Sequence, residues 1–123
     1  MMNWLMTGKE VKWQLRDVAT GKINDAIDWH FKQGDVVKIR IVNDAAGVMH
    51  AMQHPIHFHG QRFIVLSRDG VESEDHAWKD TVLVPVGSTV DILLELSNPG
   101  KWMAHCHIAE HLSTGMKMVF SVE

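Results

Sequence analysis

The segment 89–96 reads TVDILLEL, in which apolar residues stand at every second position, and the turn Ser97-Asn98-Pro99-Gly100 follows it. Alternation with a period of two indicates a strand with one buried and one solvated face. Similar short runs, bounded by Gly, Pro, Asn or Asp, lie at 11–16, 37–41, 63–66, 81–84 and 117–122. Helix signals are scarce, and the best is a single turn at 108–112. About six or seven short strands joined by such turns predict an antiparallel β-sandwich or barrel.

The chain has 123 residues, the size of one domain, so we expect a single domain over 1–123. The formal net charge is −3, and the sequence shows no cluster of basic residues, which argues against a nucleic-acid partner. No apolar run approaches the ~20 residues needed to span a bilayer. The first residues, Met1 to Met6, are too short for a signal peptide and lack its basic flank. We therefore expect that the protein is not exported or that its leader lies outside this chain.

Histidine is the informative residue. Six of the nine histidines fall in two short windows, 54–59 and 105–111, and the single cysteine lies in the second window. The first window reads His-Pro-Ile-His-Phe-His, and the second reads His-Cys-His-Ile-Ala-Glu-His. In extended chain, residues two apart point to the same face and neighbours point to opposite faces. The pairs His57/His59 and His105/His107 would then each share a face, and Cys106 would point away from its flanking imidazoles.

This spacing predicts two sets of ligands on opposite faces. The first is Cys106, His111 and Met116, to be completed by one more imidazole from the other window. A thiolate and two imidazoles with a weak thioether form the blue-copper arrangement, so copper is the expected cofactor. The second set is His57, His59, His105 and His107, whose four imidazoles suit copper, zinc, iron or nickel.

Three other chemistries fit the residues less well. Zinc sites favour paired cysteines or His/Glu sets with an open position, and one Cys between two His is poor spacing for them. A cupin would place a Glu a few residues after His59, where Phe63 and Ile64 stand. A nucleophilic role for Cys106 does not account for the flanking imidazoles or for Met116.

The motifs His-Pro-x-His-x-His-Gly at 54–60 and His-Cys-His-x3-His-x4-Met at 105–116 resemble those of the C-terminal cupredoxin domain of multicopper oxidases, a family that includes laccases. The segments 78–85 and 98–102 are also similar to that family, and the likeness covers about 34–123 well. It implies a cupredoxin-like Greek-key sandwich. We expect Trp78 and Trp102, which lie in these segments, to be core residues rather than electron relays.

The resemblance implies a role for each ligand. His54, Cys106, His111 and Met116 match the ligands of type 1 copper, with Met116 axial. His57 matches a type 2 ligand, and His59, His105 and His107 match type 3 ligands. In the family, type 1 copper accepts electrons from a small reductant, and Cys106 would pass them to His105 and His107. The trinuclear cluster then reduces O2 to water.

The resemblance also indicates what this chain lacks. The family's cluster uses eight histidines, four of them from an N-terminal domain, and His30, His50 and His76 form no His-x-His pair. We therefore expect the C-terminal domain of a larger oxidase, periplasmic or extracellular, with an N-terminal cupredoxin domain or another chain supplying four histidines. Self-association of two chains is a second way to complete the cluster, and a stand-alone blue-copper electron carrier is the alternative function. The isolated chain should reduce little O2, and the sequence leaves the reductant open.

Overall fold

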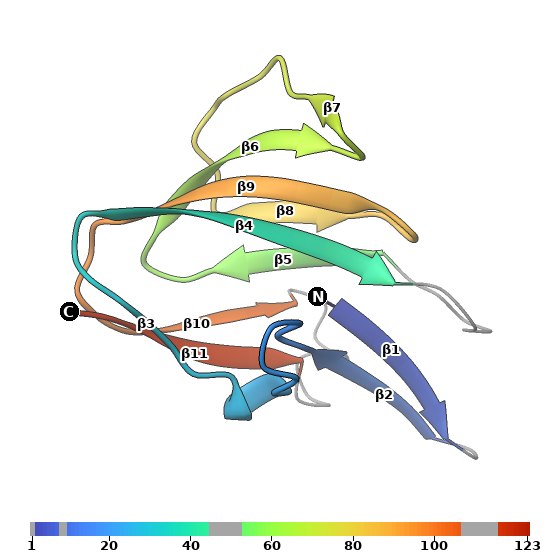
Figure 1. Cartoon of the computed structure of the whole chain (residues 1–123). Coiled ribbons are helices and arrows are strands. Elements are labelled where there is room, and N and C mark those ends of the chain that lie inside the picture. The colour runs from blue at the N-terminus through green and yellow to red at the C-terminus, as the bar shows by residue number, and fades with distance from the viewer. Residues whose placement is uncertain (1, 8–9, 45–52, 107–115) are drawn as a thin grey trace.

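The computed structural model describes residues 2–7, 10–44, 53–106 and 116–123. Regular structure in these ranges is almost entirely β-strand, with one 3-10 turn, η1 (Asn24–Ala26) (Figure 1). The strands are β1 (Met2–Thr7), β2 (Glu10–Leu15), β3 (Trp29–Phe31), β4 (Asp35–Asp44), β5 (His54–Phe58), β6 (Arg62–Arg68), β7 (Val71–Glu72), β8 (Thr81–Val84), β9 (Thr89–Leu96), β10 (Gly100–Cys106) and β11 (Lys117–Val122).

The described strands form two sheets, which confirms the predicted all-β class. One sheet has the order β2-β1-β4-β9-β6-β7, and the other has the order β3-β11-β10-β5-β8. All pairings between neighbours are antiparallel except β1 with β4 and β3 with β11. The helical turn expected at 108–112 lies outside the described residues. The two strands that carry the histidine windows, β5 and β10, are neighbours in the centre of the five-stranded sheet.

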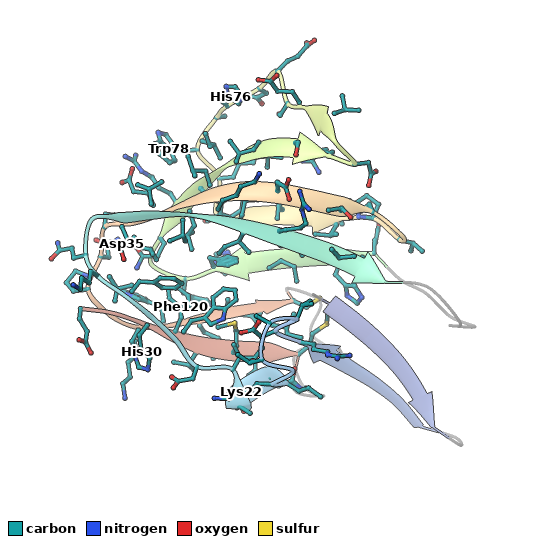
Figure 2. The ribbon with its side chains drawn as sticks, in the orientation of Figure 1. Lys22, His30, Asp35, His76, Trp78 and Phe120 are labelled. Carbon is teal, nitrogen blue, oxygen red and sulfur yellow. The ribbon has the colours of Figure 1, made fainter. Side chains whose placement is uncertain are left out.

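The core lies between the two sheets. In β9 the alternating apolar residues Val90, Ile92, Leu94 and Leu96 are all at most 1% exposed, as their period predicts. They belong to one cluster with buried side chains of the other sheet, including Phe120, which Figure 2 labels. The rings of Phe58 in β5 and Phe63 in β6 meet edge to face across the sheets at 5.8 Å. This contact packs the inward face of β5 against the six-stranded sheet, and so fixes which of its side chains face the core.

Several elements were not predicted. The strands β1, β3 and β7 were not identified from the sequence; β3 and β7 are only three and two residues long.

The two tryptophans that were expected in the core differ in their burial. The expectation that Trp78 is a core residue is wrong, because its side chain is 51% exposed and lies under the guanidinium of Arg62 at 3.9 Å. The expectation for Trp102 holds, since it packs partly buried against the core.

Candidate metal centre

Strand pairing brings the two histidine windows side by side. In the antiparallel pair β5–β10, His57 lies opposite His105 and Ile56 lies opposite Cys106. The burial of β5 alternates, with His54, Ile56 and Phe58 buried and the residues between them only partly so. His54 therefore shares the inward face with the apolar core, whereas His57 is on the outward face. His54 and His57 are three residues apart, and an odd number of residues along a strand places two side chains on opposite faces.

Three imidazoles gather on the outward face, which we call the imidazole face: His57, His59 and His105. The Nε2 atoms of His59 and His105 lie 2.9 Å apart. The ring of His57 lies 4.6 Å from that of His59 and 5.6 Å from that of His105, between centroids. The shared face expected for His57 and His59 is present. His107, the fourth member of the predicted set, lies outside the described residues.

The protonation of His105 follows from its backbone contact. Its Nδ1 lies 2.8 Å from the carbonyl oxygen of Cys106, and a carbonyl oxygen can only accept. Nδ1 therefore carries the hydrogen, and in the neutral ring Nε2 keeps the lone pair that faces His59. This is the arrangement of a metal-binding histidine, whose second ring nitrogen donates to a carbonyl or carboxylate.

The opposite face of the same strands, which we call the thiolate face, holds Cys106, His54 and Met116. All three are at most 1% exposed. The Sγ of Cys106 lies 3.7 Å from Nδ1 of His54, and the backbone N–H of Cys106 donates to the carbonyl of Met116 at 3.1 Å. The two ends of the segment that carries the predicted ligands are therefore joined. His111 lies outside the described residues.

The separation of Cys106 and His54 is compatible with one shared metal ion. With a metal–sulfur distance of about 2.3 Å and a metal–nitrogen distance of about 2.0 Å, donors 3.7 Å apart subtend roughly 115–120°. That is close to the trigonal angle of the His2Cys copper sites. Within the described residues alone, no group of three His, Cys, Asp or Glu side chains is arranged to hold a metal ion. Both predicted sets include a histidine beyond that part of the chain.

A turn clamped by a tryptophan supports the imidazole face. Gly60 follows His59 with φ of +73°, and a Cβ on it would lie 2.4 Å from the indole of Trp102 in β10. The Nε1–H of Trp102 donates to the carbonyl of Asn98, whose side-chain amide donates to the carbonyl of Gly60. Gln61 also binds the 97–98 backbone through its side chain. Only glycine fits this turn, and the turn sets where His59 enters the face.

Sequence reasoning missed a group behind His57. Its Nδ1 lies 3.0 Å from the carbonyl oxygen of Asp80 and 3.0 Å from Oγ1 of Thr81, at the start of β8. The sequence predicted a strand at 81–84 and identified the segment 78–85 by its similarity to a family, but neither pattern gave these two residues a role. The residue types alone carry no signal, because the contact depends on the β5–β8 register that places Thr81 opposite His57.

The other histidines are distant from both faces where the structure describes them. His30 pairs with Asp28 at 2.6 Å, and both side chains are mostly exposed. Figure 2 places His76 at the end of the molecule near β7 and His30 near the opposite end. His50 lies outside the described residues. An apolar cavity of about 580 Å³ lies between β4 and the five-stranded sheet, lined in part by Ile39 and Met118, and it contains none of the predicted ligands.

Comparison with known proteins matches this geometry to a family. The sequence model of the multicopper oxidase family matches residues 4–123. The iron transport multicopper oxidase fio1 of Schizosaccharomyces pombe is 35% identical over 120 residues, which cover 88% of this chain and 18% of that protein. Laccase-5 of Arabidopsis thaliana is 34% identical over 97 residues, which cover 70% of this chain and 17% of that laccase.

Solved structures give the same result. A multi-copper oxidase from Pediococcus acidilactici superposes with a TM-score of 0.74 at 30% identity, over 99% of this chain and 25% of that one. This chain thus spans about a sixth of the length of the curated relatives it matches and a quarter of that solved structure.

Proposed function

This chain belongs to the multicopper oxidase family, and from that premise we propose that it is the C-terminal copper-binding domain of such an oxidase. Its fold is cupredoxin-like and its cofactor is copper. The type 1 ligands we propose are His54, Cys106, His111 and Met116. The half-site for a type 2/type 3 cluster is proposed to be His57, His59, His105 and His107.

One observation carries this proposal. His105 and Cys106 are neighbours in β10, yet the first contacts an imidazole, His59, and the second contacts His54 on the other side of the strand. An electron carrier with a single copper has no use for the imidazole face. A domain that feeds electrons to a second site needs both faces and a short connection between them.

The chain's own residues account for much of the expected mechanism. Copper, when bound, would supply one-electron transfer at the thiolate face and reduction of O2 to water at the completed cluster. Cys106 offers a soft thiolate in a site from which water is excluded, since its side chain is fully buried. His105 is joined to Cys106 by one peptide bond and by the hydrogen bond from its Nδ1–H to the Cys106 carbonyl. The two faces are therefore linked both covalently and through a hydrogen bond.

The partners follow from the donor count. The proposed half-site of His57, His59, His105 and His107 would supply four of the eight histidines that the family's cluster uses. We propose that an N-terminal cupredoxin domain or another chain supplies the other four, and that a small reductant and O2 are the substrates. We place the protein in the periplasm or outside the cell. In the described part of the chain, no helix is long and apolar enough to cross a membrane.

The first experiment is elemental analysis of copper-loaded protein, with the solution mass measured on the same sample. About one copper per chain in a blue monomer with little O2 reduction is the result we expect for a domain awaiting its other half. More than one copper per chain in an oligomer would show that chains complete the cluster between themselves. A colourless protein, or rapid O2 reduction by a monomer, would contradict the proposal.

A stand-alone blue-copper carrier would also bind one copper, so stoichiometry alone does not separate it. The separating result is obtained by adding the N-terminal part of an oxidase of this family to the copper-loaded chain. Recovery of O2 reduction that depends on His57 and His59 supports the oxidase domain. No recovery, together with fast electron exchange at the blue copper, favours the carrier.

A further inference from the structure

The ring of His57 is oriented by hydrogen-bond partners at the start of β8, in Asp80 and Thr81. Its Nδ1 lies 3.0 Å from the carbonyl oxygen of Asp80 and 3.0 Å from the hydroxyl of Thr81. Thr81 is also the backbone partner of His57 in the β5–β8 pairing, so the hydroxyl and the ring are held in register by the sheet. The neighbouring backbone N–H of Phe58 donates to the same Asp80 carbonyl at 3.0 Å, which fixes that oxygen in place.

The donor and acceptor roles can be assigned from chemistry. The carbonyl oxygen of Asp80 can only accept, so a hydrogen bond to it requires hydrogen on Nδ1 of His57. The hydroxyl of Thr81 has one hydrogen, which it donates to the carboxylate of Asp80 at 3.0 Å. Its remaining lone pairs then face Nδ1 as acceptors. The carboxylate of Asp80 thus acts on the imidazole through the hydroxyl, and its Oδ1 lies 3.7 Å from Nδ1.

Both acceptors therefore select the same tautomer of His57. With hydrogen on Nδ1, the neutral ring keeps its lone pair on Nε2. His105 reaches the same tautomer through the carbonyl of Cys106, which is part of its own strand. His57 has a backbone acceptor as well, the carbonyl of Asp80, but it shares its Nδ1 hydrogen with a side-chain acceptor, the Thr81 hydroxyl. A mutation can remove that hydroxyl without altering the backbone.

We propose that Thr81, oriented by Asp80, is a positioning residue that makes Nε2 of His57 its metal-binding atom. This rests on the proposed function, in which His57 is a ligand of the half-site. Hydrogen-bond partners of metal-bound histidines change metal affinity by roughly 10–100-fold when removed. A purely structural Thr81 would affect folding but would leave the tautomer of His57 unchanged.

The test compares Thr81→Val, which removes the hydroxyl at nearly constant shape, with Thr81→Ser, which keeps it. Thr89→Val is the matched control, because Thr89 begins β9 in the other sheet. The first readout is long-range proton–nitrogen NMR of the metal-free protein at about pH 8, where ordinary histidines are neutral. We expect hydrogen on Nδ1 of His57 in the parent, in Thr81→Ser and in Thr89→Val. Thr81→Val should show a measurable population with hydrogen on Nε2.

The second readout is titration with Cu(II), followed separately by the blue absorption and by the non-blue electron paramagnetic resonance signal. In Thr81→Val we expect about tenfold weaker binding at the non-blue site and an unchanged blue site. An unchanged tautomer in Thr81→Val would overturn the inference, as would unchanged non-blue affinity or a Thr81→Ser protein that behaves like Thr81→Val. If the parent binds no copper, the proposed function fails, and the metal-free tautomer still decides whether Thr81 orients His57.

Discussion

The two faces of the β5–β10 pair differ in how completely the protein surrounds them. On the thiolate face, His54, Cys106 and Met116 are at most 1% exposed. On the imidazole face, the side chain of His57 is 20% exposed. The thiolate face is closed by this domain's own core, whereas on the imidazole face His57 and His59 are only partly buried and His105 alone is buried, at 5% exposed.

For the donors in β5 and β10, this difference arises from the alternation of side chains along a strand. A step of one residue, from His105 to Cys106, is enough to move a donor from one face to the other. The two environments can therefore be separated by mutation. Changes on the thiolate face should alter the blue copper, and changes around the imidazole face should leave it intact.

The largest effect is expected from Cys106→Ser. A serine hydroxyl does not replace the soft thiolate, so the variant should lose all blue absorption in a copper titration. The non-blue signal of the imidazole face should survive, because the backbone carbonyl that binds His105 is unchanged. An intense blue band in the variant would refute the assignment of Cys106.

The next effect is expected from Gly60→Ala. The new Cβ would collide with the indole of Trp102 and would occupy a left-handed backbone conformation, which together cost about 3 kcal/mol of folding free energy. Gly70→Ala is the control, because Gly70 has φ of +80° and no atom within 4 Å of the added Cβ, so only the backbone strain of about 1 kcal/mol should remain. Urea unfolding measures both.

The comparison with Gly70→Ala separates close packing from backbone strain. Equal losses in the two variants would show that Trp102 yields to the added methyl group and that the turn is not rigid. If Gly60→Ala loses more folding free energy than Gly70→Ala, its copper binding at the imidazole face should also weaken, because His59 directly precedes the displaced turn. The blue site should keep its affinity.

A smaller effect is expected from Met116→Leu, a swap that nearly conserves volume. Removing a weak thioether donor destabilises oxidised copper more than reduced copper, so the reduction potential should rise while copper is retained. A redox titration of the blue absorption measures this. An unchanged potential would mean that Met116 is a core residue and not the axial ligand.

Much of the fold could be predicted from the sequence where strands are long and one-sided. The alternation in 89–96 identified β9, and the apolar run 81–84 matches the bounds of β8. The strands β3 and β7 were missed, because segments of two or three residues carry no periodicity. Trp78 was misplaced, because an exposed indole beside Arg62 has the same composition signal as a buried one.

The candidate site was predictable in its residue types but not in its supports. Motif spacing singled out the two histidine windows and Cys106, and strand alternation predicted the shared face of His57 and His59 and the opposite directions of His105 and Cys106. The predictions for His107 and His111 lie outside the described residues. The roles of Thr81 and Gly60 could not be found in this way. Each depends on a contact between different strands, His57 with β8 and Gly60 with Trp102, and the register of those strands is set by packing of the whole core.

The smallest effect is expected far from both faces, at Asp91 on the six-stranded sheet. It accepts hydrogen bonds from Arg40 Nε at 2.8 Å and Nη2 at 3.1 Å, and this guanidinium lowers the pKa of Asp91 below its ordinary value. Because the folded pKa lies below the unfolded one, the ionised pair stabilises the fold above about pH 4. That stabilisation is lost as the pH falls through the folded pKa.

Asp91→Asn should therefore unfold at lower urea than the parent at pH 7. The difference should narrow as the pH falls below about 4 to pH 3, because the unfolded parent then begins to bind a proton at Asp91. The gap is small because the side chain of Arg40 is 64% exposed and water screens the pair. The blue absorption of the copper-loaded protein should not change, because Asp91 lies in the six-stranded sheet and the ligand strands β5 and β10 lie in the other sheet. A gap of constant size between pH 7 and pH 3 would show that Asp91 stabilises β9 by packing alone.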